Sequence, residues 1–504
     1  MAVVANLRQA QATDIVRLRP LIHDTVQDFL DTPELVHQLV QGFGSPLNII
    51  FPDHIAENLK SFQDVYRKYS LKGRIYFTSK PCKSKAIIRK ASLYDIGIDV
   101  SSSESLNHVM AAGFSPERIE ATGPKNNDYI LKCLQLDILI NVDNIAELQS
   151  IQKIRHQLGL LRKARVMIRL TGFSSPRMHF TPQDGTFGIH TKEIPALIDW
   201  LVARRDEIDF KGFSFHLTDM NEQQKLVAIE NAAQLIFHAI QKGLQPKAMN
   251  IGGGYPIQYA KDTNEYDEYI EQIKKSVIGK IENQVWNDGG LGYKDHHGVV
   301  VGGPLFMNHA PPHTKGGMLD HLLSQRSPVF GNVTYADLIR DNLLELYIEP
   351  GRAMLDQCGI TLARVTHTKN STNGELLIGL DMNRSNNHSQ NIKNLCEPVL
   401  IPRCTGRQAI PLQTRGFYYV GHLCLSYDII QYNKIYSDQI PQAGDVVAFI
   451  NTAPYIMDFT ESETLMHPVA EKVAVWKENN QFKWATDQKY LPINIYDEAE
   501  NDCQ

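Results

Sequence analysis

Short apolar runs alternate with longer amphipathic stretches from about residue 46 to about residue 350, and this rhythm constrains the fold more than any other feature. The runs 48–52 (LNIIF) and 74–80 (RIYFTSK) are typical strands, and residues 54–70 between them have helical spacing. Similar strands recur down to AMNIGGG and LELYI, with helical stretches between most of them. About eight strands in βαβ order predict a parallel sheet. That number favours an α/β fold built on a (β/α)8 TIM-like barrel over an open doubly wound sheet.

The rhythm changes after about residue 350, where short β-rich segments follow one another with few helices. This pattern predicts a C-terminal antiparallel β domain. We therefore expect a lead-in over 1–45 that packs on the β domain or on a partner, a barrel over 46–348, and a β domain over 349–504. An insertion at about 280–335, rich in Gly, His and Pro, interrupts the barrel. A structureless stretch of that length indicates a functional loop, a lid or an interface.

Composition excludes several classes of protein. The chain has 504 residues, 43% hydrophobic and 21% charged, with a net charge of -5, which excludes disordered and collagen-like chains and argues weakly against a nucleic-acid binder. Its 7 cysteines are scattered, odd in number and without a CxxC pair, which indicates reduced thiols. No apolar run approaches the roughly 18 residues of a membrane span, and the N-terminus lacks an apolar signal core. We expect a cytoplasmic protein without membrane or nucleic-acid partners.

Function in a parallel barrel lies at the carboxyl ends of the strands. The residues at or just after those ends are Lys80, Ser101, Glu104, Arg169, His216, Gly252, Gly253, Gly254, Glu349, Gly351 and Arg352. A lysine, a histidine, a glycine triplet and an acid are thus expected at one face of the barrel.

Each of these features has a functional and a plain structural interpretation. Lys80 is either a solvated lysine or an amine that forms a Schiff base. The glycine triplet is either a tight turn or a phosphate nest, without the spacing of a dinucleotide or nucleoside-triphosphate loop. Glu349 and Arg352 are either a surface ion pair or a partner for a cationic ring nitrogen and a grip on a carboxylate. Together the functional interpretations make a site for pyridoxal 5'-phosphate.

Eight motifs in the same order support this interpretation. They are Y-F-T-S-K (76–80), D-V-S-S-S-E (99–104), F-G-I (187–189), F-S-F-H (213–216), N-I-G-G-G-Y (250–255), E-P-G-R (349–352), G-H-L-C-L-S-Y-D (421–428) and A-P-Y (453–455). Over about residues 45–475 the chain resembles the fold-type III pyridoxal-phosphate amino-acid decarboxylases, nearest to the diaminopimelate decarboxylase branch. The fold implied is an alanine racemase-like barrel with a C-terminal β domain.

The resemblance implies a role for each matching residue. Lys80 would carry the Schiff base, His216 would stack on the cofactor ring, and Glu349 would protonate its pyridine nitrogen. Cys424 would return a proton to the substrate carbon, reaching in from the other subunit of a homodimer. The remaining cofactor residues would be Asp99, Arg169, Gly252, Gly253, Gly254, Gly351, Arg352 and Tyr455. Asp381 and Asp428 would lie near the substrate amine or the interface, and Arg352 near the substrate carboxylate.

The chain departs from the family pattern at two places that matter for binding. The family's H-I-G-S is replaced by residues 216–219, so Asp219 stands where a serine usually meets the phosphate. The alternative for Asp219 is a contact with a substrate amine. The insertion is longer than usual and carries His296, His297, His309, His313 and His321. Two prolines keep His309 and His313 off a common helix face, and no regular ligand spacing is present, so we expect no metal.

The sequence therefore predicts a lyase of amino-acid metabolism that removes carbon dioxide from the α-carbon of an amino acid. Two alternatives stay open: a racemase or epimerase on the same fold, and a catalytically silent protein that binds the cofactor. The resemblance leaves the substrate open among lysine, ornithine, arginine, diaminopimelate and a larger conjugated amino acid.

Overall fold

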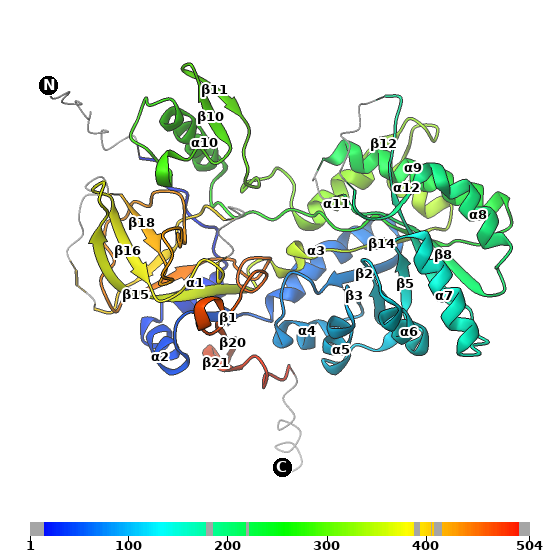
Figure 1. Ribbon diagram of the computed structural model, residues 1–504, viewed down its shortest axis with the longest axis horizontal. Coiled ribbons are helices and arrows are strands. Elements are labelled where there is room, and N and C mark those ends of the chain that lie inside the picture. The colour runs from blue at the N-terminus through cyan, green and yellow to red at the C-terminus, as the bar shows by residue number, and fades with distance from the viewer. Residues whose placement is uncertain are drawn as a thin grey trace, which may run out of the picture. The chain divides into compact units, whose positions relative to one another are not determined.

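The structure, a computed structural model, describes residues 15–177, 185–217, 221–387, 394–404, 406–407 and 416–492. The chain divides into two compact units (Figure 1). The barrel unit comprises Ile55–Pro256, His313–Met354 and Leu491–Gln504, and the β unit comprises Met1–His54, Ile257–Pro312 and Leu355–Tyr490.

A closed ring of parallel strands forms the centre of the barrel unit. In chain order the strands are β2 (Lys72–Thr78), β3 (Gly97–Val100), β4 (Ile119–Ala121), β5 (Leu139–Val142), β6 (Ala164–Thr171), β8 (Ile208–Ser214), β9 (Ala248–Asn250) and β14 (Glu345–Ile348). The ring closes because β14 pairs with both β9 and β2, and β5 pairs with β6. The short β7 (Ile189–His190) pairs with β6 alone. The predicted barrel is confirmed.

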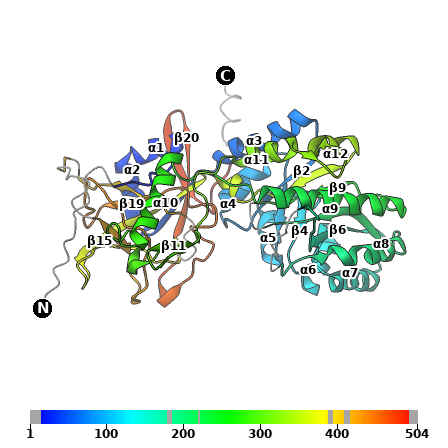
Figure 2. The same cartoon turned by 90° about the horizontal axis from the view of Figure 1, so that it is seen from above.

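Helices surround these strands, as Figure 2 shows for α5 to α9. The helices of the unit are α3 (His54–Tyr69), α4 (Lys85–Ser92), α5 (Ser103–Ala111), α6 (Asn127–Leu136), α7 (Ile145–Gln157), α8 (Ile194–Val202), α9 (Glu222–Gln241), α11 (Lys315–Ser324) and α12 (Tyr335–Asp341). Several begin at a polar residue whose side chain accepts a backbone N–H of the first turn: Ser84 for α4, Asn126 for α6 and Asn144 for α7. These caps satisfy amides that a helix start leaves without partners.

The strand predicted first in the barrel belongs to the other unit. β1 (Leu47–Ile50) pairs with β15 (Gly359–Asn370) on one side and with β20 (Glu471–Glu478) on the other. All four residues of β1 are buried. A strand buried on both faces has the same apolar pattern in a barrel and in the middle of a mixed sheet, so its sequence did not distinguish them. The barrel starts one strand later, at β2, and its eighth strand is β14, after the insertion.

The sheet of the β unit has the order β17 (Val399–Ile401), β19 (Val446–Phe449), β15, β1, β20 and β21 (Gln481–Thr486). β16 (Leu376–Leu380) extends it by pairing with β15 and with β18 (Phe417–Val420). Most pairings are antiparallel, as predicted, but β1 with β20 and β16 with β18 are parallel.

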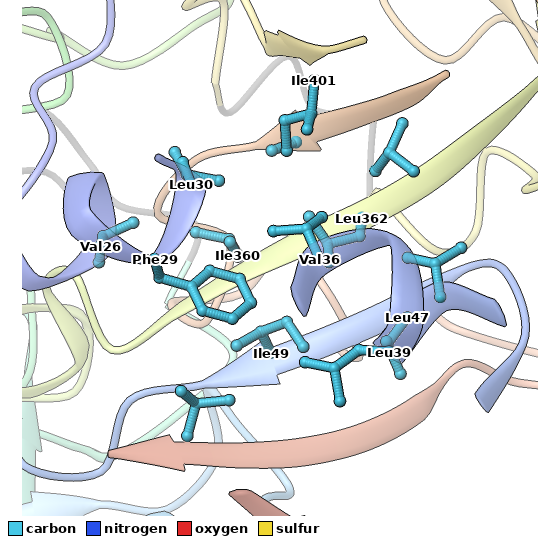
Figure 3. Packing of buried hydrophobic residues seen from close by; sticks show 14 of the residues in the cluster. Val26, Phe29, Leu30, Val36, Leu39, Leu47, Ile49, Ile360, Leu362 and Ile401 are labelled. Carbon is cyan, nitrogen blue, oxygen red and sulfur yellow. The ribbon is translucent and has the colours of Figure 1, made fainter. Parts of the chain in front are cut away.

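The N-terminal segment packs on this same sheet. Helices α1 (Asp24–Leu30) and α2 (Pro33–Phe43) place Val26, Phe29, Val36 and Leu39 in one buried cluster with strand residues such as Ile49. Figure 3 shows these side chains pointing toward one another from the two helices and the strands below them. Of the two partners considered for the lead-in, the structure therefore has it on the β sheet.

The insertion is not structureless. It follows α10 (Thr263–Val277) and contains a hairpin of β10 (Tyr293–His296) and β11 (Val299–Gly302), the helix α11, and the short pair β12 (Arg326–Ser327) and β13 (Val333–Thr334). Helix α12 begins where the insertion ends. Its first part lies in the β unit and its second part, from His313, in the barrel unit. His309 is fully buried, donates from Nδ1 to the Met307 carbonyl at 2.7 Å and accepts the Leu395 amide at Nε2 at 2.9 Å. It is a satisfied core histidine.

No helix in the described part of the chain is both long enough and apolar enough to cross a lipid bilayer.

Candidate active site

The barrel collects the predicted residues of this unit at one end. Lys80 follows β2 by two residues, His216 follows β8 by two, and Glu349 comes directly after β14. Asp99 lies in β3 and Arg169 in β6, near their carboxyl ends. Because all these strands are parallel, their carboxyl ends form one mouth of the barrel. The remaining sections of the site are the glycine loop after β9, and Gly351 and Arg352 after β14.

Glu349 is a buried carboxyl at the centre of this group. Its Oε1 accepts the Asn250 side-chain amide at 2.7 Å. Its backbone is fixed as well, since its N–H donates to the Gly252 carbonyl at 3.0 Å and its carbonyl accepts the Thr78 hydroxyl at 3.1 Å. Burial, together with the charge of Asp99, raises the pKa of Glu349 to about 7, against the opposing effects of Arg169, Asn250 and Lys80. The carboxyl is therefore poised to hold or release a proton near neutral pH.

Asp99 and Lys80 belong to the same electrostatic cluster. Burial raises the pKa of Asp99, opposed by a hydrogen bond from the Thr122 hydroxyl at 2.5 Å and by the positive charges of Lys80 and Arg169. Lys80 itself is exposed. An amine that is open to solvent yet acts on buried carboxyls lies at the boundary between the barrel interior and its entrance.

His216 is a neutral ring. Burial, followed by the charges of Lys80, Arg169 and Lys225, lowers its pKa to about 3. The Gly253 N–H donates to His216 Nδ1 at 3.1 Å, which leaves the ring proton on Nε2. A neutral, flat and fixed imidazole suits contact with a planar ring.

The glycine loop tolerates no side chain at its first two positions. A Cβ at Gly252 would lie 2.4 Å from the Phe215 carbonyl oxygen, and one at Gly253 would lie 2.6 Å from the Glu349 carbonyl oxygen. Gly252, with φ of 66°, donates its N–H to Asn250 Oδ1 at 2.9 Å, and Gly253 donates to His216. In the described part of the chain, the amides of Gly254 and Tyr255 make no hydrogen bond. The loop therefore offers an anion these later amides, not those of Gly252 and Gly253.

Lys225 was not identified from the sequence. It lies in the first turns of α9, its Nζ donates to the Gly253 carbonyl, and it stands 4.6 Å from the centre of the Tyr255 ring. Burial lowers the pKa of Lys225 to about 7. In the sequence Lys225 is a single lysine ahead of the apolar run LVAI. We searched for site residues only at strand ends, and this lysine lies in a helix.

Two further buried polar residues were also missed, Glu120 in β4 and Asn250 at the end of β9. Asn250 donates to Glu349, and its amide nitrogen also lies 3.1–3.2 Å from both carboxyl oxygens of Glu120. Their signal was a polar side chain inside an otherwise apolar strand. In a barrel such a position points to the interior, where a polar group needs partners.

Four predicted residues lie in the β unit. Cys424 is an exposed free thiol in the segment that follows β18. Asp428 is buried, and its two carboxyl oxygens accept the amides of Arg384 and Leu423, each at 2.8 Å, so it shapes the loop that carries Cys424. Asp381 contacts His422 Nδ1 at 3.2 Å. Tyr455 has φ of 69° and makes an edge contact with Phe459. Asp219 lies outside the described residues.

The described residues bring three side chains that could bind a metal to one place: Glu222, His313 and His321. His321 Nε2 lies 3.0 Å from the Glu222 carboxyl. The two imidazole rings stack, with centroids 4.2 Å apart and an angle of 18° between their planes. An imidazole binds a metal in its own plane, and two nearly parallel planes do not meet at one ion. We therefore interpret the group as an ion pair with a stacked neighbour.

Comparison with known proteins shows what this arrangement is similar to. Residues 52–289 match the model of the pyridoxal-binding domain of pyridoxal-dependent decarboxylases. This part of the chain, just under half of it, is therefore similar to that decarboxylase family. An uncharacterized protein, y4yA, of Sinorhizobium fredii is 27% identical over 466 residues, which cover 91% of this chain and 94% of that protein.

Diaminopimelate decarboxylase of Bacillus subtilis is 27% identical over 254 residues, which cover 47% of this chain and 57% of that enzyme. The match thus spans less than two thirds of that relative. The crystal structure of diaminopimelate decarboxylase from Helicobacter pylori, complexed with L-lysine, superposes with a TM-score of 0.63 at 18% identity, covering 93% of this chain and 100% of that one. At that identity the likeness establishes the fold.

The residues of the barrel mouth fit the cofactor of this family, pyridoxal 5'-phosphate. The glycine loop packs so closely on neighbouring backbone that Gly252 and Gly253 have no room for a Cβ, and the amides of Gly254 and Tyr255 and the buried Lys225 side chain lie beside it. The buried Glu349 carboxyl suits a ring nitrogen, and the buried hydroxyl of Tyr255 has no hydrogen-bond partner among the described residues. An anion site, an acid and an amine are the groups that a pyridine ring with an aldehyde and a phosphate requires.

Proposed function

We propose that this protein is a pyridoxal-phosphate-dependent carboxy-lyase that removes the α-carboxylate of an amino acid as carbon dioxide. The observation that carries the proposal is the buried Glu349 carboxyl, held by Asn250 at 2.7 Å at the mouth where Lys80 and His216 also lie. When bound, the cofactor supplies an electron sink for the pair left on the α-carbon. The other tasks, which are binding, orientation and proton transfer, are assigned to residues of the protein.

Glu349 is proposed to keep a proton at the pyridine nitrogen. Its buried carboxylate stabilises a positive ring nitrogen, because an opposite charge in a poorly solvated site interacts strongly. A protonated ring withdraws electrons better than a neutral one, so an acid at this position favours loss of carbon dioxide. The fold-related alanine racemases resemble this barrel but use an arginine there, which makes the racemase alternative weaker for this chain.

The remaining roles follow the same logic. Lys80 would hold the cofactor through its side-chain amine. Lys225, Gly254 and Tyr255, with Gly351 and Tyr455, would bind the phosphate, and His216 would contact one ring face. Arg352 would bind a carboxylate of the substrate. Asp381 and Asp428 stay candidates for the substrate amine or the interface.

Cys424 is proposed as the acid that returns a proton to the α-carbon. Its side chain is exposed on the β unit, so it is available to a second chain. We therefore propose a homodimer in which Cys424 of the partner subunit completes each site. A free thiol in that role requires a reducing compartment, which favours the cytoplasm.

A substrate screen tests the proposal. The purified protein, loaded with pyridoxal phosphate, is incubated with lysine, ornithine, arginine, diaminopimelate and larger conjugated amino acids, and mass spectrometry follows the loss of carbon dioxide. The expected result is one amine product that Lys80→Ala abolishes. Inverted substrate without loss of mass would instead establish the racemase. The absorbance spectrum of the cofactor-loaded protein is compared with that of Lys80→Ala. If the two spectra are the same and no amino acid gives a product, both the decarboxylase and the racemase are contradicted.

A further inference from the structure

A second fully buried carboxyl lies beside Glu349, and the reaction as described does not use it. Glu120 is the middle residue of β4 and has no exposed surface. The side-chain amide of Asn141 donates to its Oε1 at 2.9 Å, and the amide of Asn250 lies 3.2 Å from Oε1 and 3.1 Å from Oε2. Residues of two other strands, Asn141 in β5 and Asn250 in β9, thus converge on this carboxyl.

Asn250 links this carboxyl to Glu349. Its Oδ1 accepts the Gly252 N–H at 2.9 Å, which fixes the amide so that its NH2 group faces the two acids. The same nitrogen lies 2.7 Å from Glu349 Oε1. An NH2 group has two protons, so one proton serves each carboxyl.

Asn141 is oriented in the same manner. The Ser214 hydroxyl donates to Asn141 Oδ1 at 2.6 Å, which leaves the Asn141 NH2 group for Glu120. The network therefore runs from Ser214 through Asn141, Glu120 and Asn250 to Glu349. Every amide orientation in it is determined by a second partner.

Two buried acids joined through one amide cannot both be ionised at low cost. Burial, and then the charges of Glu349 and Asp99, raise the pKa of Glu120 well above its ordinary value, whereas Glu349 is assisted by Arg169 and Lys80. The other titratable groups that interact with Glu120 are Tyr76 and Tyr347, whose own pKa values are raised chiefly by burial. These neighbours hold the proton on Glu120 more firmly than on Glu349, so Glu349 is the first of the two to carry the negative charge as the pH rises.

We infer that Glu120 is a positioning residue: it stays protonated, holds the Asn250 amide against Glu349, and so leaves the buried negative charge to the carboxyl that meets the pyridine nitrogen. This inference rests on the proposed function. It adds a residue to the reaction that touches neither the proposed substrate nor the proposed cofactor and acts through Asn250.

Two variants of the full chain separate this role from a merely structural one. Glu120→Gln keeps the shape and the neutral state of the side chain, and Glu120→Leu removes the acceptors of Asn141 and Asn250. With Glu120→Gln we expect kcat within about twofold of the wild type. We also expect no change in the pH at which the absorbance spectrum of the bound cofactor changes, which we call the spectral transition. With Glu120→Leu the Asn250 amide is no longer held in place, and its hydrogen bond to the charged Glu349 carboxyl weakens. We therefore expect kcat to fall by about tenfold to a hundredfold at nearly constant KM, and the pH at which the bound-cofactor spectrum changes to shift.

Infrared spectroscopy of the cofactor-free protein gives an independent reading. The carbonyl band of a protonated carboxyl should be present at pH 7 in the wild type and diminished in Glu120→Gln. If Glu120→Leu does not fold, Asn250→Ala removes the same link and should move the spectral transition in the same way. A folded Glu120→Leu with wild-type kcat and spectrum, or a Glu120→Gln as damaged as Glu120→Leu, would overturn the inference.

The outcome is distinguishable from failure of the proposed function. If the wild type bound no pyridoxal phosphate, the proposed function would fail. The role of Glu120 in that reaction would then fail as well. An unchanged infrared band in Glu120→Gln, in a wild type that does bind the cofactor and decarboxylate an amino acid, would overturn the inference about Glu120 alone.

Discussion

Lys225 is a buried cation whose hydrogen bond goes to a carbonyl, the Gly253 oxygen. Burial lowers its pKa to about 7, so the site gains stability when an anion arrives to pair with the ammonium. Lys225 brings a basic side chain to the glycine loop, beside the Gly253 carbonyl and the Tyr255 ring. A phosphate contact is therefore the natural use of this lysine.

Lys225→Met should weaken binding of pyridoxal phosphate by roughly tenfold or more, the usual effect of losing a charge-assisted hydrogen bond. Binding of pyridoxal, which lacks the phosphate, should change by less than about twofold on the same grounds. Equilibrium titration of both ligands measures the difference. The matched control is Lys242→Met, which removes an exposed lysine paired with Asp199. Equal losses for both ligands would contradict a phosphate contact.

Glu349 links stability to pH in the cofactor-free protein. Its pKa in the folded state is about 7, above the ordinary value of 4.5, so the folded state binds the proton more tightly. The stability due to this group is complete below pH 4.5 and is lost as the pH rises through 7. Glu349→Gln should therefore be more stable than the wild type at pH 8, by roughly 1–3 kcal/mol, with the difference vanishing near pH 4.

Urea unfolding at the two pH values measures this effect. Glu345→Gln, at the start of the same strand β14, serves as the control for loss of a carboxyl from this strand. If the two proteins differed in the free energy of unfolding by the same amount at both pH values, folding would not raise the pKa of Glu349 and the prediction would be wrong.

At the scale of the element, the loop after β9 is defined by how closely it approaches its neighbours. A Cβ at Gly253 would lie 2.6 Å from the Glu349 carbonyl oxygen, and backbone cannot move aside as a flexible side chain can. The loop and the start of the segment after β14 therefore fix each other, and the position of Glu349 depends on the absence of a side chain at Gly253.

Gly253→Ala should destabilise the protein by about 1–3 kcal/mol, as overpacking does, and should abolish binding of pyridoxal phosphate. Gly317→Ala is the control, because that glycine lies in α11 with open space around it. Alanine there should be neutral or slightly stabilising. Thermal unfolding and ligand titration compare the two variants. If both variants unfolded at the same temperature and bound the cofactor equally well, the loop would have room for a Cβ and the prediction would be wrong.

At the scale of the whole molecule, the two units carry different parts of the proposed reaction. Lys80 and Glu349 belong to the barrel unit and Cys424 to the β unit. If each site takes Cys424 from the partner subunit, the functions of Lys80 and Cys424 in one site come from different chains. Two inactive variants can then complement each other.

A mixture of Lys80→Ala and Cys424→Ala, dissociated and reassociated at equal amounts, should recover about a quarter of wild-type activity, because half of the dimers are mixed and each mixed dimer of twofold symmetry has one intact site. Each variant alone, treated in the same way, is the control. Sedimentation establishes that dimers have re-formed. Mixed dimers without activity would place both residues of a site on one chain.

The sequence was most informative where chemistry and strand ends coincide. The shared location of Lys80, His216 and Glu349 could be predicted because a parallel barrel brings every strand end to one mouth, whereas their roles stay predictions. The same reasoning missed Lys225 in a helix and Glu120 inside a strand, since neither position is a strand end. The first strand was assigned to the wrong sheet because Leu47–Ile50 is buried on both faces and carries no periodicity that distinguishes the two sheets.

The sequence by itself therefore determined the class of fold and the similarity to pyridoxal-dependent decarboxylases, and it predicted a set of candidate site residues, since these depend on local periodicity and on short motifs. Only the tertiary structure decided which sheet β1 joins, that Asn250 bridges Glu120 and Glu349, and that the loop amides left for an anion are those of Gly254 and Tyr255. These facts depend on contacts between residues 99 to more than 300 positions apart in the chain, such as Asn250 with Glu349 and Leu47 with Leu362. Spacing along the sequence does not encode which distant strands become neighbours, because that follows from closing the ring and packing the sheets.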